Sequence, residues 1–510
     1  MLAGVLAACG FASAGEPYAP TKRYASPTMW ILGPWYATGA PKYGGCACPP
    51  PHTFEREVDY ELEHFESNNL PVTVFLADGE PWGEPEKDGR WRGGAENLKR
   101  FEKQKIRVLL HYWGGGQTEE QWKRAHADVG QVLGGFYFDD YSTVKQIREC
   151  VDFMQRIMPG DAEIIMKAYQ YGGDVKKDQL ARYGTTCYVN DLCPDYGGLR
   201  EGIRRVFEYS DVLPAPFNEF TAYEYKQKIR PDEETFFRRL HFGAMQVVMA
   251  HTPFLHCDPW ADGYSPDLLK TYRYWSWVHW ELAPYLYSYL YNAYETNQPV
   301  LREPNSKDYS VKLGDEFFVK YITEPNVKET EVNLPAGEWI DYWDLSRVVK
   351  GPTALRQPCP PGREPTFIKN GAIIPLRVKN DETRSGTSAS EGSLTVRVFP
   401  SGESRFHYRD DAGKAWQTFT SSQSGNGLKV EIDKSLSRPV LYRIERWPEA
   451  PKSVSADERA VQVNGAGKTP RLNTEEAVNG STTPAWFYDE KRRLLIVKAL
   501  VNAKAAEGGL

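Results

Sequence analysis

Eight short apolar runs alternate with charged stretches between residues 28 and 260, and this alternation constrains the fold more than any other feature. The runs span residues 30–33, 71–78, 106–113, 134–140, 162–169, 185–191, 210–217 and 247–255. Most of the intervening segments, such as 54–69 and 118–129, carry apolar residues at helical spacing. Strand–helix alternation favours a parallel sheet with crossover helices, and eight units over about 230 residues fit a (β/α)8 barrel better than an open sheet.

The remainder of the chain has a different pattern. Residues 265–297 form a long aromatic-rich helical region, which we expect to break near Pro284. Beyond residue 300, short strand-like runs alternate with Gly, Pro, Asn and Asp turns, and the polar stretch 380–393 has the composition of a linker or exposed loop. We therefore predict an α/β fold, a (β/α)8 TIM barrel followed by two all-β sandwich domains. The expected boundaries are 1–27 for a leader or linker helix, 28–298 for the barrel, 299–379 for the proximal β-sandwich and 380–510 for the distal β domain.

Composition excludes several classes of protein. The 510 residues contain 62 Lys and Arg against 68 Asp and Glu, a net charge of −6, which argues against a nucleic-acid-binding surface. No run of 18 apolar residues predicts a membrane span. Eight cysteines in this length do not form a disulfide scaffold. Aromatic residues make up 13%, which indicates large aromatic cores or ring stacking against sugars.

The first residues admit two interpretations. Residues 6–9 and 12–14 resemble processing sites of secreted proteins, but no Lys or Arg precedes Lys22 to form a positive n-region. The segment is either a signal, which would make the protein periplasmic or secreted, or a helix that follows an upstream domain, which would leave a cytoplasmic location open.

Two acidic residues stand at the ends of predicted strands. Asp139 ends the fourth run and Asp191 ends the sixth. Glycosidases use two carboxyl groups that flank the scissile bond, and strand ends of one barrel hold such groups rigidly around a shared cavity. The alternative is that each Asp caps the helix that follows it.

Several motifs together resemble glycoside hydrolase family 31, the α-glucosidase and α-xylosidase family. The motifs are SPTMWILGPW (26–35), LPVTVFLAD (70–78), GFYFDDYS (135–142), ARYGTTCYVND (181–191), DEETFFRRLHFGAMQVVMAHTPF (232–254) and LPAGEWIDYW with FIKNGAIIPL in the β region. The resemblance covers nearly all of the chain. It implies that Asp139 is the nucleophile and Asp191 the acid/base of a retaining double displacement. It further implies that Asp78 and His251 bind the sugar, and it calls for no cofactor or metal.

The sequence also departs from the family pattern around these residues. The family's Trp before the nucleophile is Tyr137 here, the Met after it is Asp140, and the Trp of the acid/base motif is Tyr188. The family's Arg after the fifth strand aligns with Lys167 or Ala168, and Glu219 and Trp113 are further subsite candidates by position. Asp140 leaves the register of the nucleophile open by one residue. The family's N-terminal β-sandwich has no counterpart before residue 28, which implies a fragment or a subfamily without that domain.

The expected function is a retaining, exo-acting α-glycoside hydrolase that cleaves a non-reducing-end sugar through a covalent glycosyl-enzyme. Its partner would be an α-linked oligosaccharide or glycoside, and the sequence indicates no oligomeric state. Two alternatives stay open: an α-glucan-lyase-like enzyme and a non-catalytic carbohydrate-binding protein of the same fold. A metal site at His251, His256, Cys257 and Asp258 is not expected, because these residues lack a recognised ligand spacing.

Overall fold

The structure of the chain is a computed structural model. It describes residues 27–37, 54–77, 95–112, 120, 123, 127, 132–138, 145, 149, 151–153, 156, 163–167, 186–189, 193–210, 213, 215–220, 230–252, 257–411 and 415–500.

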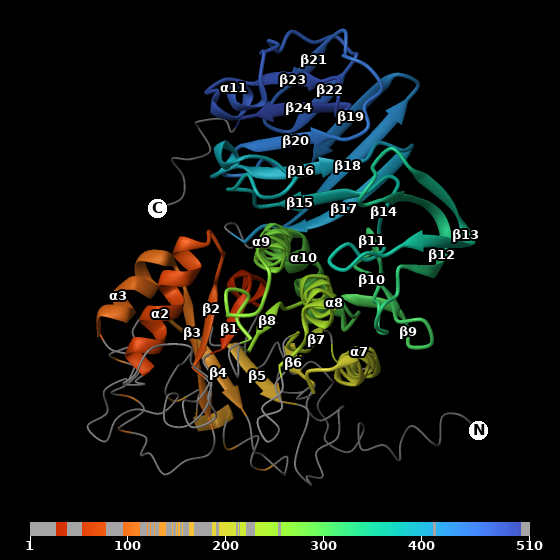
Figure 1. Ribbon diagram of the computed structural model, residues 1–510. Helices are drawn as coiled ribbons and strands as arrows, with labels where there is room; N and C mark the ends of the chain where they lie inside the picture. The colour runs from red at the N-terminus through yellow and green to blue at the C-terminus, as the bar shows by residue number, and fades with distance from the viewer. Residues whose placement is uncertain are drawn as a thin grey trace, which may run out of the picture.

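An eight-stranded parallel sheet forms the N-terminal half of the described fold (Figure 1). Its strands are β1 (Trp35–Ala37), β2 (Val74–Ala77), β3 (Arg107–Tyr112), β4 (Leu133–Phe138), β5 (Glu163–Lys167), β6 (Thr186–Tyr188), β7 (Ala215–Phe217) and β8 (Ala250–His251). The order is β7-β6-β5-β4-β3-β2-β1-β8, and every pairing is parallel. Just beyond β7, the backbone N–H of Phe220 donates to the carbonyl of Ala250 in β8 at 3.0 Å. The chain just after β7, at one end of the sheet, is therefore hydrogen-bonded to β8 at the other end.

Seven of the eight predicted runs contain or overlap a strand of this sheet, but the first prediction is wrong. Residues Met29–Leu32 form a 3-10 helix, η2, and the strand begins at Trp35. Ile31 and Leu32 are fully buried within that turn. A short apolar run buried on all sides carries no periodicity, so the sequence pattern could not distinguish a helical turn from a strand.

Amphipathic helices accompany the strands of the parallel sheet. They are α2 (Phe54–Ser67), α3 (Ala95–Gln104), α7 (Tyr196–Tyr209) and α8 (Glu233–Ala244). In α2 the buried residues Val58, Leu62 and Phe65 recur at spacings of four and three, which places them on one face. Asp195 and Asp232 begin α7 and α8 by accepting a hydrogen bond from the backbone N–H three residues later, at 2.8 Å in each case.

Two aromatic helices separate the parallel sheet from the C-terminal β region (Figure 1). They are α9 (Pro266–Glu281) and α10 (Ala283–Thr296), so the break expected near Pro284 is confirmed. Trp275 of α9 stacks on Tyr342 with ring centroids 6.0 Å apart. Tyr285 of α10 stacks on Phe406 at 5.7 Å. Most of the aromatic side chains of these helices therefore serve packing between regions.

The C-terminal region contains three further sheets. The first has the order β13-β12-β14-β11-β10-β9, with β9 (Leu301–Asn305), β10 (Ser310–Leu313), β11 (Phe317–Lys320), β12 (Glu329–Asp341), β13 (Val348–Pro358) and β14 (Thr366–Lys369). The second has the order β15-β16-β20-β24-β23, with β15 (Ile373–Leu376), β16 (Leu394–Val398), β20 (Val440–Ile444), β23 (Ala485–Asp489) and β24 (Leu494–Ala499). The third has the order β17-β18-β19-β22-β21, with β17 (Glu403–Arg409), β18 (Trp416–Ser424), β19 (Gly427–Ile432), β21 (Val454–Ala456) and β22 (Ala460–Val463). A short helix, α11 (Glu475–Gly480), precedes β23.

β15, which precedes the expected boundary at residue 379, belongs to the second C-terminal sheet. It pairs with β16 rather than with β14. The stretch 380–393 is not an exposed linker. Asn380 and Thr383 donate hydrogen bonds to the buried carboxylate of Glu281 at the end of α9, at 2.9 and 2.7 Å. Polar side chains of the stretch 380–393 thus form hydrogen bonds with the buried Glu281, and the composition of the stretch does not indicate this.

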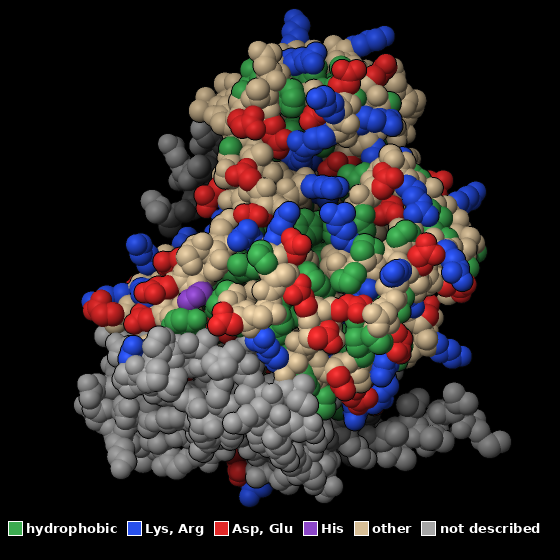
Figure 2. Space-filling view, viewed as in Figure 1, with side chains coloured by type: hydrophobic (Ala, Val, Ile, Leu, Met, Phe, Trp, Pro, Cys, Tyr) green, Lys and Arg blue, Asp and Glu red, His purple; other side chains and the backbone are tan. Residues whose placement is uncertain are grey.

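Charge on the visible surface is mixed in sign. Figure 2 shows Lys and Arg side chains interspersed with Asp and Glu over the C-terminal sheets, in keeping with the net charge of −6. Within the described part of the chain, no helix has the length and apolar character needed to cross a membrane.

Candidate active site

The candidate residues follow the C-terminal ends of the parallel strands. Because all eight strands run in the same direction, these ends share one edge of the sheet. By position, Asp78 follows β2, Trp113 follows β3, Tyr137 lies in β4, Asp139 and Asp140 follow β4, Lys167 ends β5, Tyr188 ends β6, Asp191 comes three residues after β6, Glu219 comes two residues after β7 and His251 ends β8.

Asp78, Trp113, Asp139, Asp140 and Asp191 lie outside the described residues, as do the side chains of Lys167 and Tyr188. The described structure therefore gives the surroundings of Tyr137, Glu219 and His251 only.

His251 is buried in an aromatic pocket at the end of β8. Its Nδ1 lies 3.0 Å from the hydroxyl of Tyr272 on α9, and the ring centroids of Phe220 and Tyr36 lie 5.3 and 5.4 Å away. Burial lowers the pKa of His251 to about 3, so the imidazole is neutral at neutral pH. Among the described residues its buried Nε2 has no hydrogen-bond partner.

A buried acidic cluster adjoins His251. The hydroxyl of Tyr36 on β1 donates to Oδ1 of Asp258 at 2.6 Å. Burial raises the pKa of Asp258 to about 7, and burial followed by the charge of Asp258 raises the pKa of Glu61 on α2 well above its ordinary value. Trp260 stacks over the Tyr36 ring at 6.5 Å. The cluster thus holds fewer negative charges at neutral pH than its carboxyl groups suggest.

Glu219 connects the ends of β7 and β8. It is buried, and its Oε2 accepts a hydrogen bond from the hydroxyl of Thr252, the residue after His251. Tyr137 is also buried, and in the register of the sheet it pairs with His111 of β3 and Ile165 of β5. Both side chains therefore belong to the interior of the strand-end region.

Arg239 on α8 forms hydrogen bonds with two chain segments near the C-terminal ends of the strands. Its guanidinium donates to the carbonyl oxygens of Cys193, Asp195 and Phe220, the last two at 2.7 and 3.3 Å. Burial lowers the pKa of this guanidinium to about 10, although the charges of Asp195 and Glu219 oppose the shift. One buried cation thus connects the chain that follows Asp191 with the chain that follows Glu219.

Sequence reasoning missed three residues of this region, Tyr36, Tyr272 and Arg239, and named Asp258 only in a metal site that it did not expect. Tyr36 would have been a candidate with the first strand placed at 35–37, since it lies in that strand. Tyr272, Arg239 and Asp258 carry no local signal, because each reaches the region from a loop or from an outer helix. No group of three or more His, Cys, Asp and Glu side chains with the geometry to hold a metal ion occurs among the residues the structure describes.

Comparison with known proteins shows which families and enzymes this chain is similar to. A family model described as the glycosyl hydrolase family 31 C-terminal domain matches residues 289–374. An isomaltosyltransferase from Sporosarcina globispora is 25% identical over 238 residues, which are 44% of this chain and 21% of the relative. Alpha-glucosidase 2 from Bacillus thermoamyloliquefaciens is 26% identical over 272 residues, 49% of this chain and 32% of the relative. The aligned part of the chain thus spans about a fifth to a third of the length of these relatives.

The fold agrees with a solved structure over nearly all of the chain. The cycloalternan-forming enzyme from Listeria monocytogenes, solved with a pentasaccharide substrate, superposes with a TM-score of 0.72 and 16% sequence identity. The match covers 94% of this chain and 54% of the other. The parallel sheet and the β sheets that follow it therefore share the arrangement of that protein.

Proposed function

Because this chain is a member of glycoside hydrolase family 31, we propose that it hydrolyses an α-glycosidic bond at the non-reducing end of its substrate. The finer form of the proposal is a closed (β/α)8 barrel with Asp139 as nucleophile and Asp191 as acid/base, acting with retention of configuration. The barrel would occupy residues 28–298, followed by the β regions.

The strand order is the observation that carries this proposal. β4 and β6, which precede Asp139 and Asp191 in the sequence, are both parallel neighbours of β5. Two residues that follow such strands leave the sheet at the same edge, about two strand spacings of roughly 4.8 Å apart. Carboxyl groups that start from such positions can converge on one sugar, as a retaining mechanism requires.

The reaction would proceed in two displacements. The carboxylate of Asp139 attacks the anomeric carbon while Asp191 gives its proton to the glycosidic oxygen, so a glycosyl ester forms and the C–O bond to the leaving group breaks. Water then attacks the anomeric carbon, Asp191 accepts its proton, and the ester bond to Asp139 breaks. The balance needs water alone and no cofactor.

His251 would bind the sugar in its neutral form. When the Tyr272 hydroxyl donates to Nδ1, the ring proton resides on Nε2, which can donate to a sugar hydroxyl. The low pKa of His251 supports this role. A neutral imidazole does not need a negative charge beside it, so it does not depend on either of the two proposed catalytic carboxyl groups. Asp78, Lys167, Trp113, Tyr137, Tyr188, Asp140 and Glu219 remain proposed subsite residues.

A panel of aryl α-glycosides tests the proposal. We expect turnover of at least one α-linked glucoside, xyloside, galactoside or N-acetylgalactosaminide, with release of the intact sugar. Binding of a sugar with no turnover across the panel would refute hydrolysis and favour a non-catalytic binding protein. An unsaturated sugar product, detected by mass spectrometry, would instead identify a lyase.

Glycosyl transfer is a second candidate, because the isomaltosyltransferase is among the relatives reported above. In that reaction a sugar hydroxyl replaces water as the nucleophile in the second displacement. Product analysis with and without added glucose oligosaccharides distinguishes the two, since transfer gives longer oligosaccharides and hydrolysis gives free sugar.

A further inference from the structure

A cavity of about 470 Å³ lies away from the candidate active site, where α10 meets the first and third C-terminal sheets. Its lining comprises Ser288, Tyr289, Asn292, Glu295, Gln298, Arg302, Asp315, Glu316, Arg405, Phe406, His407 and Trp416. None of these residues belongs to the parallel sheet or to the candidate active site. The volume falls within the range of roughly 300–1,000 Å³ that small-molecule sites occupy.

Aromatic rings form part of the wall of this cavity. Trp416 at the start of β18 is only partly buried, and its Nε1 donates to Oε2 of Glu295 at 3.0 Å. This bond fixes the indole to α10. Phe406 and Tyr289 meet edge to face with ring centroids 5.9 Å apart, and both are buried, Phe406 against Tyr285 and Tyr289 beneath Arg302. The partly exposed indole of Trp416 therefore provides the stacking surface, since flat aromatic faces pack well against the C–H faces of sugar rings.

One carboxyl group that lines the cavity, that of Glu316, is buried. Glu316 is 7% exposed, and its Oε2 accepts hydrogen bonds from the hydroxyls of Tyr285 and Tyr289 at 2.8 and 2.6 Å and from the N–H of Asp315 at 3.2 Å. Its other oxygen, Oε1, accepts no hydrogen bond from any described residue. Burial raises the pKa of Glu316 above its ordinary value, so the group is closer to neutral than an exposed glutamate.

Polar groups around the rim remain available to a ligand. Among the described residues, the side-chain amides of Asn292 and Gln298 make no hydrogen bonds. Arg302 is paired with Asp315 at 2.6 Å and lies 4.9 Å from the Tyr289 ring centroid. The paired charges and the raised pKa of Glu316 leave little net charge to attract an ion. Amide groups and a carboxyl oxygen without partners suit hydroxyl groups, which both donate and accept.

We propose that this cavity is a second carbohydrate site, which binds a neutral pyranose oligosaccharide by stacking on Trp416 and by hydrogen bonds to Asn292, Gln298 and Oε1 of Glu316. It does no chemistry on the sugar. It would hold an oligosaccharide on the enzyme at a point separate from the strand ends.

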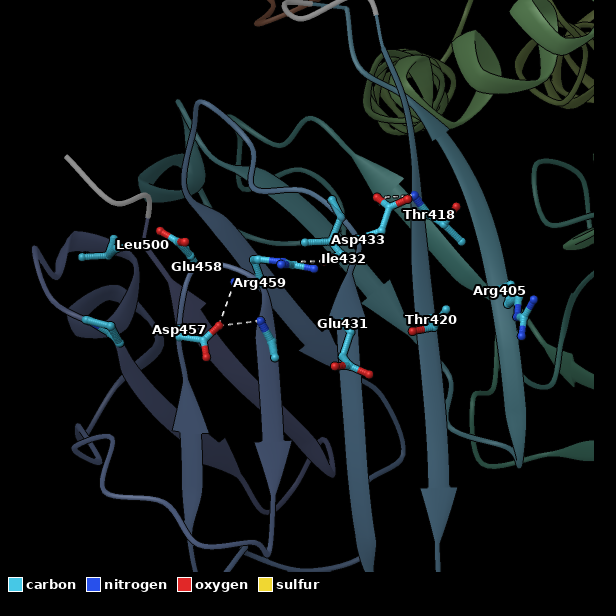
Figure 3. Close-up of a pocket in the computed structure, with 12 residues that line it drawn as sticks. Arg405, Thr418, Thr420, Glu431, Ile432, Asp433, Asp457, Glu458, Arg459 and Leu500 are labelled. Atoms are coloured by element: carbon cyan, nitrogen blue, oxygen red, sulfur yellow. Dashed lines mark hydrogen bonds between the residues drawn. The ribbon is translucent and has the colours of Figure 1, made fainter. Parts of the chain in front are cut away.

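A larger groove of about 1110 Å³ on the third C-terminal sheet provides a contrast (Figure 3). Its twelve lining residues include no aromatic ring. Two of its acids are occupied by backbone N–H donors, Asp433 by Thr418 at 3.0 Å and Asp457 by Arg459 and Ala460 at 2.8 Å (Figure 3). Arg405 lines both hollows, so the groove adjoins the proposed site, yet it lacks the stacking surface.

Titration calorimetry of the full chain tests the second site. The parent protein carries Asp139→Ala, so that the probe is not consumed, and the probes are isomaltotriose, maltotriose and cellotriose. We expect at least one probe to bind, and Trp416→Ala to weaken one class of sites about tenfold or more. Asn292→Ala should weaken it about three- to tenfold, as expected for one lost hydrogen bond. Arg459→Ala in the groove is the matched control and should leave the affinity unchanged.

The possible results of this experiment either support the second site or overturn it. Thermal melts establish that each variant folds, and Asn292→Ala keeps the test valid if Trp416→Ala does not fold, because this amide makes no hydrogen bond to a described residue. Unchanged isotherms for both pocket variants, or an equal loss in Arg459→Ala, would overturn the proposal. Binding of glucuronate or glucosamine oligomers in place of the neutral probes would also overturn it. Binding is measured without turnover, so this result and the proposed hydrolysis succeed or fail separately.

Discussion

The guanidinium of Arg239 donates to the carbonyl oxygen of Asp195 at 2.7 Å, which attaches α8 to the chain four residues beyond Asp191. The same group also reaches Cys193 and Phe220. It thus connects residues 193–195, which follow Asp191 in the sequence, with Phe220, the residue after Glu219.

Replacement of Arg239 should therefore affect both stability and activity. Arg239→Ala removes the guanidinium hydrogen bonds to three carbonyl oxygens, of which that of Phe220 is buried, and should lower the free energy of unfolding by about 3 kcal/mol. Arg239→Lys keeps the charge but cannot reproduce the planar fork, so we expect partial recovery. Denaturant unfolding and kcat at a temperature where both variants are folded provide the measurements. As the control, Arg204→Ala on the exposed face of α7 removes only ion pairs to Glu201 and Glu208 and should change stability by less than about 0.5 kcal/mol.

The Tyr272 hydroxyl should matter for substrate binding through His251. Tyr272→Phe removes the hydrogen-bond partner of Nδ1 of His251. The ring proton is then no longer held on Nε2, so we expect kcat/KM to fall about three- to tenfold. Tyr274→Phe on the same helix removes a comparable hydroxyl contact, to Tyr342 at 2.8 Å, and should leave kcat/KM unchanged. An equal effect of both variants would mean that Tyr272 acts on stability alone.

Asp258 should make the protein less stable as the pH rises. Its pKa is about 7 in the folded chain against 3.8 ordinarily, so the folded state binds more protons than the unfolded state between these values. Stability is therefore lost as the pH rises from about 4 to about 7. The buried His241 and His279, with pKa values lowered to about 3 and 4, act in the opposite direction, because stability is lost as the pH falls below about 6.5.

A difference between two proteins isolates the Asp258 contribution. Asp258→Asn keeps an acceptor for the Tyr36 hydroxyl but cannot ionise. The Tm of this variant minus that of the parent should be larger at pH 8 than at pH 5. A difference independent of pH would show that Asp258 is ionised throughout.

Gly198 should tolerate no side chain. A Cβ at this position would lie 2.0 Å from the carbonyl oxygen of Cys193, and backbone cannot move aside as a flexible side chain can. Gly198→Ala should therefore displace the start of α7 and lower the Tm by several degrees, at roughly 2–4 °C per kcal/mol for a large domain. Gly480→Ala, where a Cβ meets nothing within 4 Å, is the control and should melt within about a degree of the parent.

The proposed catalytic pair predicts a specific pattern of loss. Asp139→Ala should lower turnover of every aryl glycoside by orders of magnitude. Asp191→Ala should lose about 10²–10⁴-fold with poor leaving groups but much less with activated ones, which need no proton. If Asp140→Ala inactivates the enzyme and Asp139→Ala does not, the nucleophile lies one residue later. A fluorosugar adduct located by mass spectrometry identifies the nucleophile and the accepted sugar together.

Strand positions were predictable because they depend on local patterns. Each of the seven correct runs concentrates β-branched and aromatic residues between turn residues, and the break between α9 and α10 follows from Pro284. The sheet to which β15 belongs was not predictable, since a strand's composition does not say which sheet it joins. The sequence motifs name candidate residues at the strand ends. They do not indicate which other residues surround these candidates.

Local periodicity and motif order were sufficient to indicate the class of fold, the family and the residues on which the chemistry should depend. The partners of those residues come from long-range contacts. Tyr36 and Asp258 are 222 positions apart, and Arg238 reaches Glu364 across 126. Whether a carboxyl group is ionised, or an amide is left for a ligand, depends on which distant groups fold against it, because desolvation and hydrogen bonding act through space and leave no periodic trace along the chain.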